Sequence, residues 1–262
     1  MSVLCLMNDL ETIGLDDDAG IVQIGLVAFD PETFQPVSKF KCNIDTAALI
    51  MEGFSYTPST MEFWSKQSPE AKQSVFYSEV VSPRQAAHMV NTWLLETFNG
   101  HDMEVWACGI LFDVVKLDNL LSHYGIVTIQ ERTKYSAILD YRSIRKFTQR
   151  VHPIAFKQAE ALISNSRAHD ALADCLYQIA MLDACHQICG GTFLVTDGDD
   201  TDIVAPAVDR EIHNGVEVGM GSPQVVIAET PEWDDHELEG DVEFESHLTE
   251  PKVVTESLAD RV

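Results

Sequence analysis

The chain has 262 residues, 45% of them hydrophobic, so it can bury the core of one large domain or of a domain with an extension. A formal net charge of −25 argues against nonspecific nucleic-acid binding over the whole surface. The sequence opens with no basic region followed by a secretory apolar segment, and its longest apolar stretch, at 21–29, is too short to span a bilayer. The six cysteines show no disulfide-framework spacing, and we therefore expect reduced thiols in a cytoplasmic protein without membrane contacts.

Three strands open the chain and are predicted to form an antiparallel meander, because only short links separate them. Helices then alternate with two further strands, and strands separated by helices favour parallel pairing. The expected strands are 3–9, 21–30, 37–44, 104–108 and 136–139, and the expected helices are 60–65, 68 onward, 82–98, 113–124, 140–150 and 168–189. The predicted fold class is α/β, with a mixed five-stranded sheet (three antiparallel strands, then parallel strands) and helices on both faces.

The C-terminal quarter differs in composition from the rest. Residues 197–262 contain 19 acidic residues against three basic ones. An Asn-Gly pair at 214–215, between alternating residues, indicates a β-hairpin, and the acidic run from residue 229 onward predicts disorder. We therefore predict a folded domain over 1–196 and an acidic extension over 197–262.

A basic segment contrasts with the acidic chain. Residues 132–167 contain eight Lys or Arg and only two acidic residues. Such a strip suits the groove of a polyanion substrate. A solvated helix face is an equally good interpretation of the charge pattern alone.

Asp9 and Glu11 stand at the end of the first apolar run, and if the strand continues through them they share a face, because residues two apart on a strand do so. Like charges this close repel each other, and a hard divalent cation such as Mg²⁺ would remove that cost. A helix or turn start is the ordinary alternative for Asp-x-Glu. A second candidate is Asp113, which begins a helix just after a strand, where α/β sites gather. An N-cap role is its ordinary alternative.

His169 and Asp174 form the third motif. Five residues of helix turn through about 500°, so the two side chains converge only if His169 lies at or before the helix start. The nearby Cys185, His186 and Cys189 have no second ligand pair, and a packed helix is a better interpretation than a zinc site.

Taken in order, these motifs resemble the DEDDh family of 3′→5′ exonucleases, which have a ribonuclease H-like fold. The stretches 9–12 and 169–178 are similar to the first and third family motifs, and 63–71 resembles the subgroup that includes phage exonuclease A. The resemblance covers roughly residues 1–190. The second motif departs from the pattern, because 109–112 is unusually apolar.

The resemblance implies a catalytic set that uses two Mg²⁺ or Mn²⁺ ions. Asp9, Glu11 and Asp174 would hold one ion, Asp9 and Asp113 would hold the other, and His169 would be the general base. The substrate would be a single-stranded 3′ end of DNA, or alternatively RNA, and the product a nucleoside 5′-monophosphate. If a phage encodes the chain, the location would be the host cytoplasm.

A few further residues are candidates for substrate contact. The resemblance implies that the terminal nucleotide lies against the backbone at Leu10 and Thr12. Phe63, Trp64 and Phe112 could stack on bases, although core packing is the commoner fate of such side chains. An alternative of another class is a non-catalytic interaction protein whose acidic tail mimics nucleic acid. The presence of all five motif residues favours the enzyme. The oligomeric state is not predicted.

Overall fold

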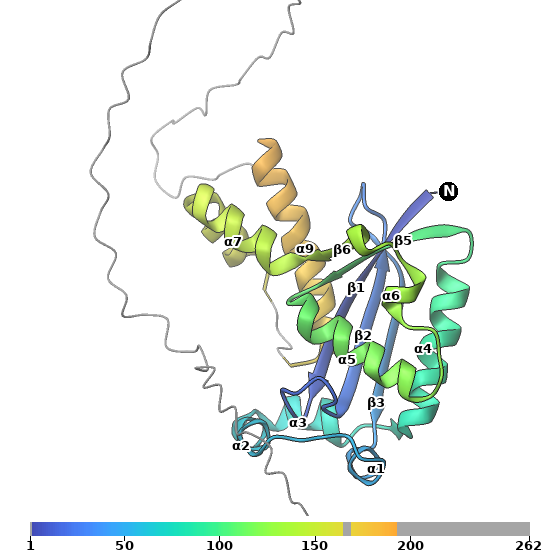
Figure 1. Ribbon diagram of the computed structural model, residues 1–262. Coiled ribbons are helices and arrows are strands. Elements are labelled where there is room, and N and C mark those ends of the chain that lie inside the picture. Colours follow the sequence, from blue (N-terminus) through green and yellow to red (C-terminus); the bar gives the residue numbers. More distant parts are fainter. Residues whose placement is uncertain (1, 165–168, 193–262) are drawn as a thin grey trace, which may run out of the picture. The chain divides into compact units, whose positions relative to one another are not determined.

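A computed structural model describes residues 2–164 and 169–192 of the chain (Figure 1). The strands are β1 Ser2–Thr12, β2 Ile21–Phe29, β3 Pro36–Ile44, β4 Val80–Val81, β5 His101–Ala107 and β6 Ile138–Asp140. The helices are α1 Thr46–Met51, α2 Pro58–Lys66, α3 Pro69–Phe76, α4 Pro83–Thr97, α5 Ile110–His123, α6 Ile129–Arg132, the 3₁₀ turn η1 Tyr135–Ala137, α7 Tyr141–Val151, α8 Pro153–Leu162 and α9 Ala171–Gly190.

The strands form one mixed sheet in the order β4-β3-β2-β1-β5-β6. β1, β2 and β3 pair antiparallel, whereas β5 is parallel to β1 and β6 is parallel to β5. This confirms the predicted α/β fold class. The sheet has six strands rather than five, because the two-residue β4 adds to β3 in parallel register.

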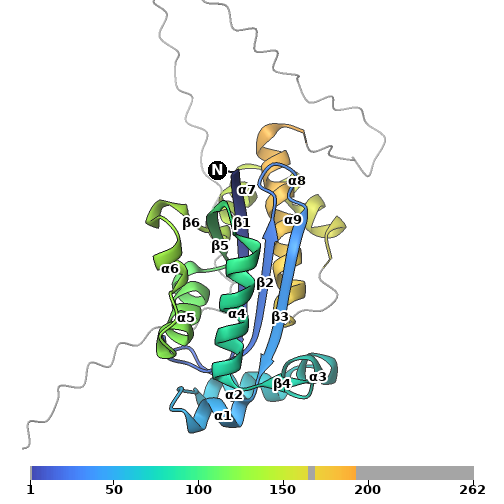
Figure 2. The same cartoon turned by 90° about the vertical axis from the view of Figure 1, so that its right-hand side faces the viewer.

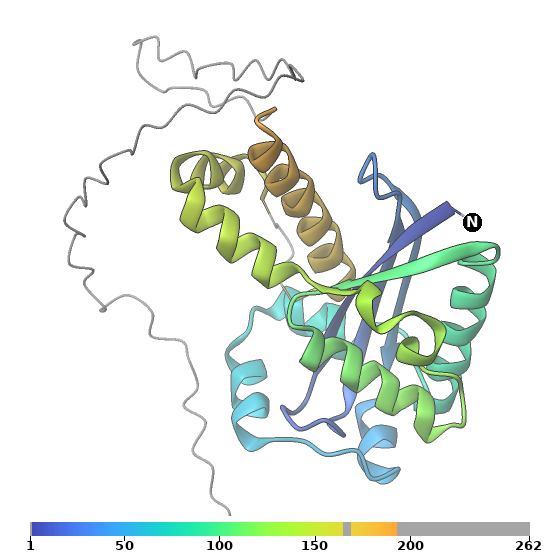
Figure 3. The ribbon, with the colours of Figure 1, turned by 45° about the horizontal axis from the view of Figure 1, so that its top comes forward.

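Helices cover both faces of the sheet and make a three-layer structure (Figures 2 and 3). On one face, α4 and α5 supply apolar residues to a buried cluster that includes Leu6, Leu10 and Val114. On the other face, α7, α8 and α9 enclose a second cluster that includes Met7, Val27 and Cys175. β2 is buried along its whole length, because both layers cover it. Alternate β1 residues face the two clusters, as the period of a strand requires.

The remaining differences from the predicted elements are local. The short helices α1 and α6 lie where no helix was predicted, and α9 begins at Ala171 rather than at residue 168. Cys185 and Cys189 lie on α9, as expected for a packed helix, and all six cysteines are free thiols. The predicted hairpin, the acidic extension and the 196/197 boundary lie outside the described residues. Within the described ranges, no helix has both the length and the apolar character needed to cross a membrane.

Candidate active site

β1 carries Asp9 and Glu11 past the end of its neighbour β5. The parallel pairing of β1 with β5 stops at Asn8, opposite Ala107, whereas β1 continues to pair with β2 up to Thr12. The β1–β2 register shifts between Glu11 and Thr12, and such irregularities often re-aim side chains beside active sites. The two carboxylates therefore lie on the same face of an overhanging strand end.

A glycine directly opposite Asp9 lets a helix approach this face. Asp9 pairs with Gly25 of β2, and residues paired in this way point their side chains to the same face of a sheet. A Cβ atom built on Gly25 would lie 2.3 Å from the carbonyl carbon of Ala171, the first residue of α9. Only glycine therefore fits here, and its lack of a side chain brings the start of α9 beside Asp9.

Two polar contacts fix the start of α9 in that place. The Ala171 backbone N–H donates to Oε1 of Gln23 at 2.7 Å. Lys41 Nζ donates to Asp170 Oδ2 at 2.6 Å, and this partly buried ion pair joins β3 to the N-cap of the helix. These contacts come from β2 and β3, so the sheet itself positions the helix.

Asp174 and His169 converge because the chain turns just before α9. Asp174 lies in the first turn of the helix, and His169 precedes the helix in a left-handed conformation with φ of 65°. The His169 backbone N–H donates to Asp174 Oδ2 at 3.1 Å. Non-glycine residues seldom adopt this backbone conformation, and functional sites are where it concentrates.

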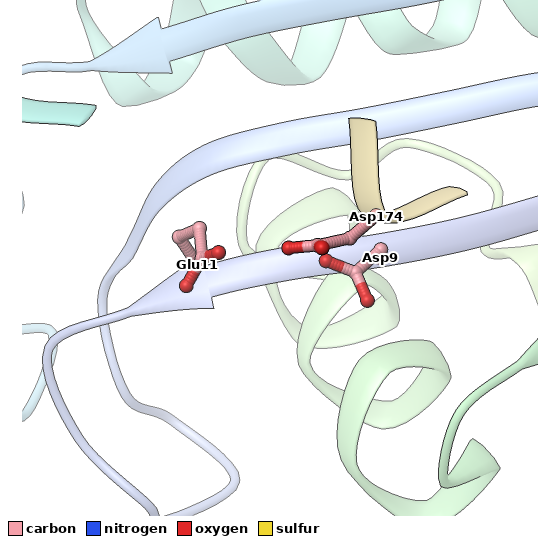
Figure 4. A group of neighbouring side chains, drawn as sticks. All are labelled: Asp9, Glu11 and Asp174. Carbon is pink, nitrogen blue, oxygen red and sulfur yellow. The ribbon is translucent and has the colours of Figure 1, made fainter. Parts of the chain in front are cut away.

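Asp9, Glu11 and Asp174 form a carboxylate cluster (Figure 4). Each residue offers one oxygen, and these three oxygens lie within 4.8 Å of one another. Burial, then the charge of Asp174, raises the pKa of Asp9 to about 8, and burial, then the charges of Asp9 and Asp174, raises the pKa of Glu11 to about 9. Without a cation, the cluster therefore holds protons near neutral pH.

Asp113 lies beside this cluster without belonging to it. It is buried in the first turn of α5, and burial followed by the charge of Asp9 raises its pKa, whereas a hydrogen bond from the Leu10 backbone lowers it. The turn that starts α5 includes Gly109, whose φ is 105°. Arg142 of α7 stabilises this turn, because its Nη2 donates to the Cys108 carbonyl at 2.9 Å.

Gln178 contacts the cluster although the sequence did not single it out. It lies one helical turn after Asp174 on α9, and its Nε2 donates to Asp9 Oδ1 at 2.7 Å. Its own Oε1 is buried and has no hydrogen-bond partner among the described residues. Its i+4 spacing from Asp174 and its place at the end of the stretch 169–178 are sequence signals that could have identified it.

The α2 helix supplies an aromatic wall next to His169. The ring centroids of Phe63 and His169 lie 5.2 Å apart in an edge-to-face arrangement, and the ring centroid of Trp64 lies 6.0 Å from that of His169. Phe63 is 42% exposed, whereas Trp64 is 3% exposed and donates its Nε1–H to the Thr12 carbonyl at 2.8 Å. Of these two candidates for stacking on a base, Phe63 is exposed to solvent and Trp64 is buried.

The other predicted substrate contacts lie around the end of β1. The side chains of Leu10 and Thr12 are buried, and the Thr12 hydroxyl donates to the Gly14 carbonyl at 2.9 Å. The ring of Phe112 is partly exposed, and the Lys116 ammonium lies 3.8 Å from its centroid. Lys116 also donates to the Leu15 carbonyl at 2.8 Å, which ties α5 to the loop after β1.

Sequence comparison identifies a family and a curated relative. Residues 5–186 match the model of the 3'-5' exoribonuclease Rv2179c-like domain. An exodeoxyribonuclease of Enterobacteria phage T4 is 30% identical over 125 residues, which is 43% of this chain and 53% of the phage protein. The chain thus matches only about half the length of this relative.

Solved structures of exonuclease I share the fold. E. coli exonuclease I in complex with a dT13 oligonucleotide aligns with a TM-score of 0.51 and 16% identity, over 71% of this chain and 41% of that chain. Exonuclease I from Methylocaldum szegediense aligns with a TM-score of 0.52 and 16% identity, over 71% and 40% of the two chains. On the strength of the family model, which spans most of the described fold, the chain belongs to the 3'-5' exoribonuclease Rv2179c-like domain family.

Proposed function

We propose that the protein is a metal-dependent exonuclease that removes nucleoside 5′-monophosphates from single-stranded 3′ ends. The observation that carries this proposal is the cluster of Asp9, Glu11 and Asp174, whose three oxygens lie within 4.8 Å of one another. Glu11 is buried and Asp9 and Asp174 are partly buried, and a bound cation would offset the repulsion between carboxylates this close. The family membership supports the reaction class.

The donor set fits Mg²⁺ or Mn²⁺, because both prefer carboxylate oxygens. We propose that Asp9, Glu11 and Asp174 hold one ion and that Asp9 and Asp113 hold a second. When bound, the pair of ions would acidify a water and offset charge on the attacking and leaving oxygens. Gln178 would orient the Asp9 carboxylate, because its Nε2 donates to one of the two carboxylate oxygens.

His169 is the proposed general base. Its backbone is fixed by the hydrogen bond to Asp174, and its imidazole is held against Phe63. No residue of the described part of the chain forms a hydrogen bond with the ring nitrogens. The imidazole is therefore available to take the proton of the attacking water.

The proposed position of the 3′-terminal nucleotide is the end of β1. The nucleotide would contact the backbone at Leu10 and Thr12, and Phe63 would stack on a base, since stacking tolerates any sequence. Trp64 would support Phe63 from the core, because its own ring is buried. Phe112 would contact the substrate with the edge of its ring, because Lys116 covers one face of the ring.

Single-stranded DNA is the first candidate substrate and RNA the second. A phage exodeoxyribonuclease and a complex of exonuclease I with a dT13 oligonucleotide are among the relatives, which supports DNA. The description of the matching family as exoribonuclease supports RNA. The two substrates differ in the 2′-hydroxyl, which a close-fitting site can read.

Digestion of 3′-labelled and 5′-labelled DNA and RNA single strands would test this proposal. With Mg²⁺ or Mn²⁺, we expect the 3′ label to be released first as a mononucleotide, and EDTA to stop the reaction. Asp9→Asn keeps the side-chain volume and should lower the rate by at least about a thousandfold, since Asp9 is proposed to contact both ions. Release from the 5′ end, or activity retained by Asp9→Asn, would contradict the assignment. Binding without hydrolysis by the unmodified chain would favour the non-catalytic alternative.

A further inference from the structure

The α7 helix presents a row of exposed cations on an otherwise acidic chain. Arg142, Lys146 and Arg150 are exposed and spaced four residues apart, so they follow one another along the same side of the helix. Tyr141–Val151 contains no acidic residue, although the chain carries a net charge of −25. Within the described residues, neither Lys146 nor Arg150 forms an ion pair or a side-chain hydrogen bond. This row is thus free to meet an external anion.

Exposed apolar side chains run beside this row. Phe147 is 60% exposed and Val151 is 50% exposed, and both lie on the neighbouring strip of the helix surface. The opposite side of α7 packs through Tyr141 and Thr148, both buried, towards α9 (Figure 3). The exposed half of the helix therefore combines a line of cations with an open aromatic ring.

The row of cations starts at the candidate active site. Asp140, the N-cap of α7, accepts a hydrogen bond from the Ile110 backbone at the start of α5 at 3.3 Å. The guanidinium of Arg142 closes the Cys108–Gly109 turn, which leads into Asp113. From there the helix leads away from the edge of the sheet (Figure 1). The three cations cover about 12 Å along the helix axis.

We propose that α7 is a binding track for the single-stranded nucleic acid that trails behind the reacting 3′ end. Lys146 and Arg150 would contact successive phosphates, and Phe147 would stack on a base. Charge complementarity and continuity with the site support a nucleic-acid strand over a protein or a membrane. This inference rests on the proposed function for the position of the 3′ end.

Equilibrium binding of a fluorescent oligothymidylate to the full chain, in EDTA so that no hydrolysis occurs, tests the track. Removing both cations with Lys146→Ala/Arg150→Ala should raise Kd several-fold and reduce the slope of log Kd against log salt by about 1.4, because each phosphate contact on a single strand contributes about 0.7. Phe147→Ala should raise Kd at least about fivefold and leave the salt slope unchanged. These side chains are exposed, so the variants should keep the melting temperature of the parent.

The matched control is Lys39→Ala/Arg84→Ala, which removes the same charge from exposed positions outside α7 and outside the basic segment 132–167. We expect this control to keep the salt slope of the parent protein. Turnover provides a second readout: the α7 double variant should raise KM for a long oligothymidylate and leave hydrolysis of a dinucleotide unchanged, because a dinucleotide does not reach the track.

Several outcomes would overturn the track. One is an unchanged salt slope in the α7 double variant, and another is an equal slope change in the control. A third is loss of binding to anionic phospholipid vesicles with oligonucleotide binding intact, which would assign the helix to a membrane surface instead. Failure of the proposed function gives a different pattern, in which the parent binds the strand through α7 but hydrolyses neither substrate.

Discussion

At the scale of single residues, the arrangement around Asp9 explains why this carboxylate is central. Its neighbours are Glu11 on the same strand and, on α9, Asp174 and Gln178, which lie one helical turn apart. Burial and then the charge of Asp174 oppose the ionisation of Asp9, and the hydrogen bond from Gln178 favours it. The balance leaves the pKa of Asp9 at about 8, so a cation is needed to keep it ionised at lower pH.

A variant of His169 should distinguish proton transfer from metal binding. We expect His169→Ala to lower turnover by about 10²-fold or more, because it removes the general base. The carboxylates stay in place, so Mn²⁺ should still raise the melting temperature of the variant as it does that of the parent. Turnover and thermal melts with and without Mn²⁺ would check this. Loss of the Mn²⁺ effect would mean that His169 supports the cluster instead.

Gln178 should act on metal affinity. Gln178→Ala removes the donor to Asp9 Oδ1, and we expect a 10-fold to 100-fold rise in the Mg²⁺ concentration that gives half-maximal activity, which is about the usual cost of losing such a partner. The matched control is Gln187→Ala on the same helix, where Gln187 Nε2 likewise donates to an aspartate, Asp183. The control should leave the Mg²⁺ titration unchanged. Equal effects from both variants would point to a general loss of helix stability.

The sequence predicted the candidate metal-binding residues better than it predicted the residues that hold them in place. The spacing of Asp9 and Glu11 predicts a shared strand face, because the period of a strand is local information. The contacts of Gln178 with Asp9 and of Gln23 with Ala171 join positions 169 and 148 residues apart. No local pattern encodes such pairs, so the structure was needed to identify them.

At the scale of elements, the site depends on how closely α9 approaches β2. Gly25 makes this approach possible, since a Cβ atom there would lie 2.3 Å from the Ala171 carbonyl carbon. Gln23 and Lys41 then hold the start of the helix by polar contacts. A substitution on β2 should therefore change the position of Asp174, which lies in the first turn of α9.

Gly25→Ala should displace the start of α9 and with it Asp174. We expect the free energy of unfolding to fall by about 1–3 kcal/mol and activity to fall further than stability alone explains. The control is Gly190→Ala at the other end of α9, where a Cβ atom would meet only Thr192 Oγ1 at 4.0 Å. Denaturant titration and turnover under fully folded conditions would check both variants. An unaltered rate in Gly25→Ala would show that Asp174 does not depend on this contact.

The long strands were predicted, and the elements that the sequence missed are all short. β1, β2 and β3 were expected from their alternation and apolar runs, and the structure confirms them. β4 has two residues and pairs with β3 across an intervening stretch of helices, so its signal is not local. α1 has six residues and α6 four, which is too short for a hydrophobic period to emerge.

At the scale of the whole molecule, the cluster should couple stability to pH and to metal. Folding raises the pKa of Asp9 from 3.8 to about 8 and that of Glu11 from 4.5 to about 9, so the folded chain binds more protons than the unfolded chain between these limits. The free energy of unfolding of the metal-free protein should therefore fall as pH rises from about 4 to 9. We expect the melting temperature to drop across this range by several degrees, at about 2–4 °C per kcal/mol.

Mg²⁺ should offset this loss, and its stabilising effect should be larger at pH 8 than at pH 5. The double variant Asp9→Asn/Glu11→Gln removes both titrating groups and provides the control. Its melting temperature should depend less on pH and should not respond to Mg²⁺. Melting curves across pH, with EDTA or with Mg²⁺, would check both statements. A metal-free protein that becomes more stable from pH 5 to pH 8 would contradict the pKa shifts of the cluster.

The complete burial of β2 also determines which parts of the site can open independently. A central strand covered on both faces should exchange its amide hydrogens with solvent only when the whole domain unfolds, and Asp9 and Glu11 lie on its direct partner β1. The α2 helix that carries Phe63 packs at the margin of the fold, and its amides should exchange through smaller, local openings. The carboxylate cluster should therefore persist through local openings of α2. A nucleic-acid strand could then enter past Phe63 while Asp9 and Glu11 stay in place.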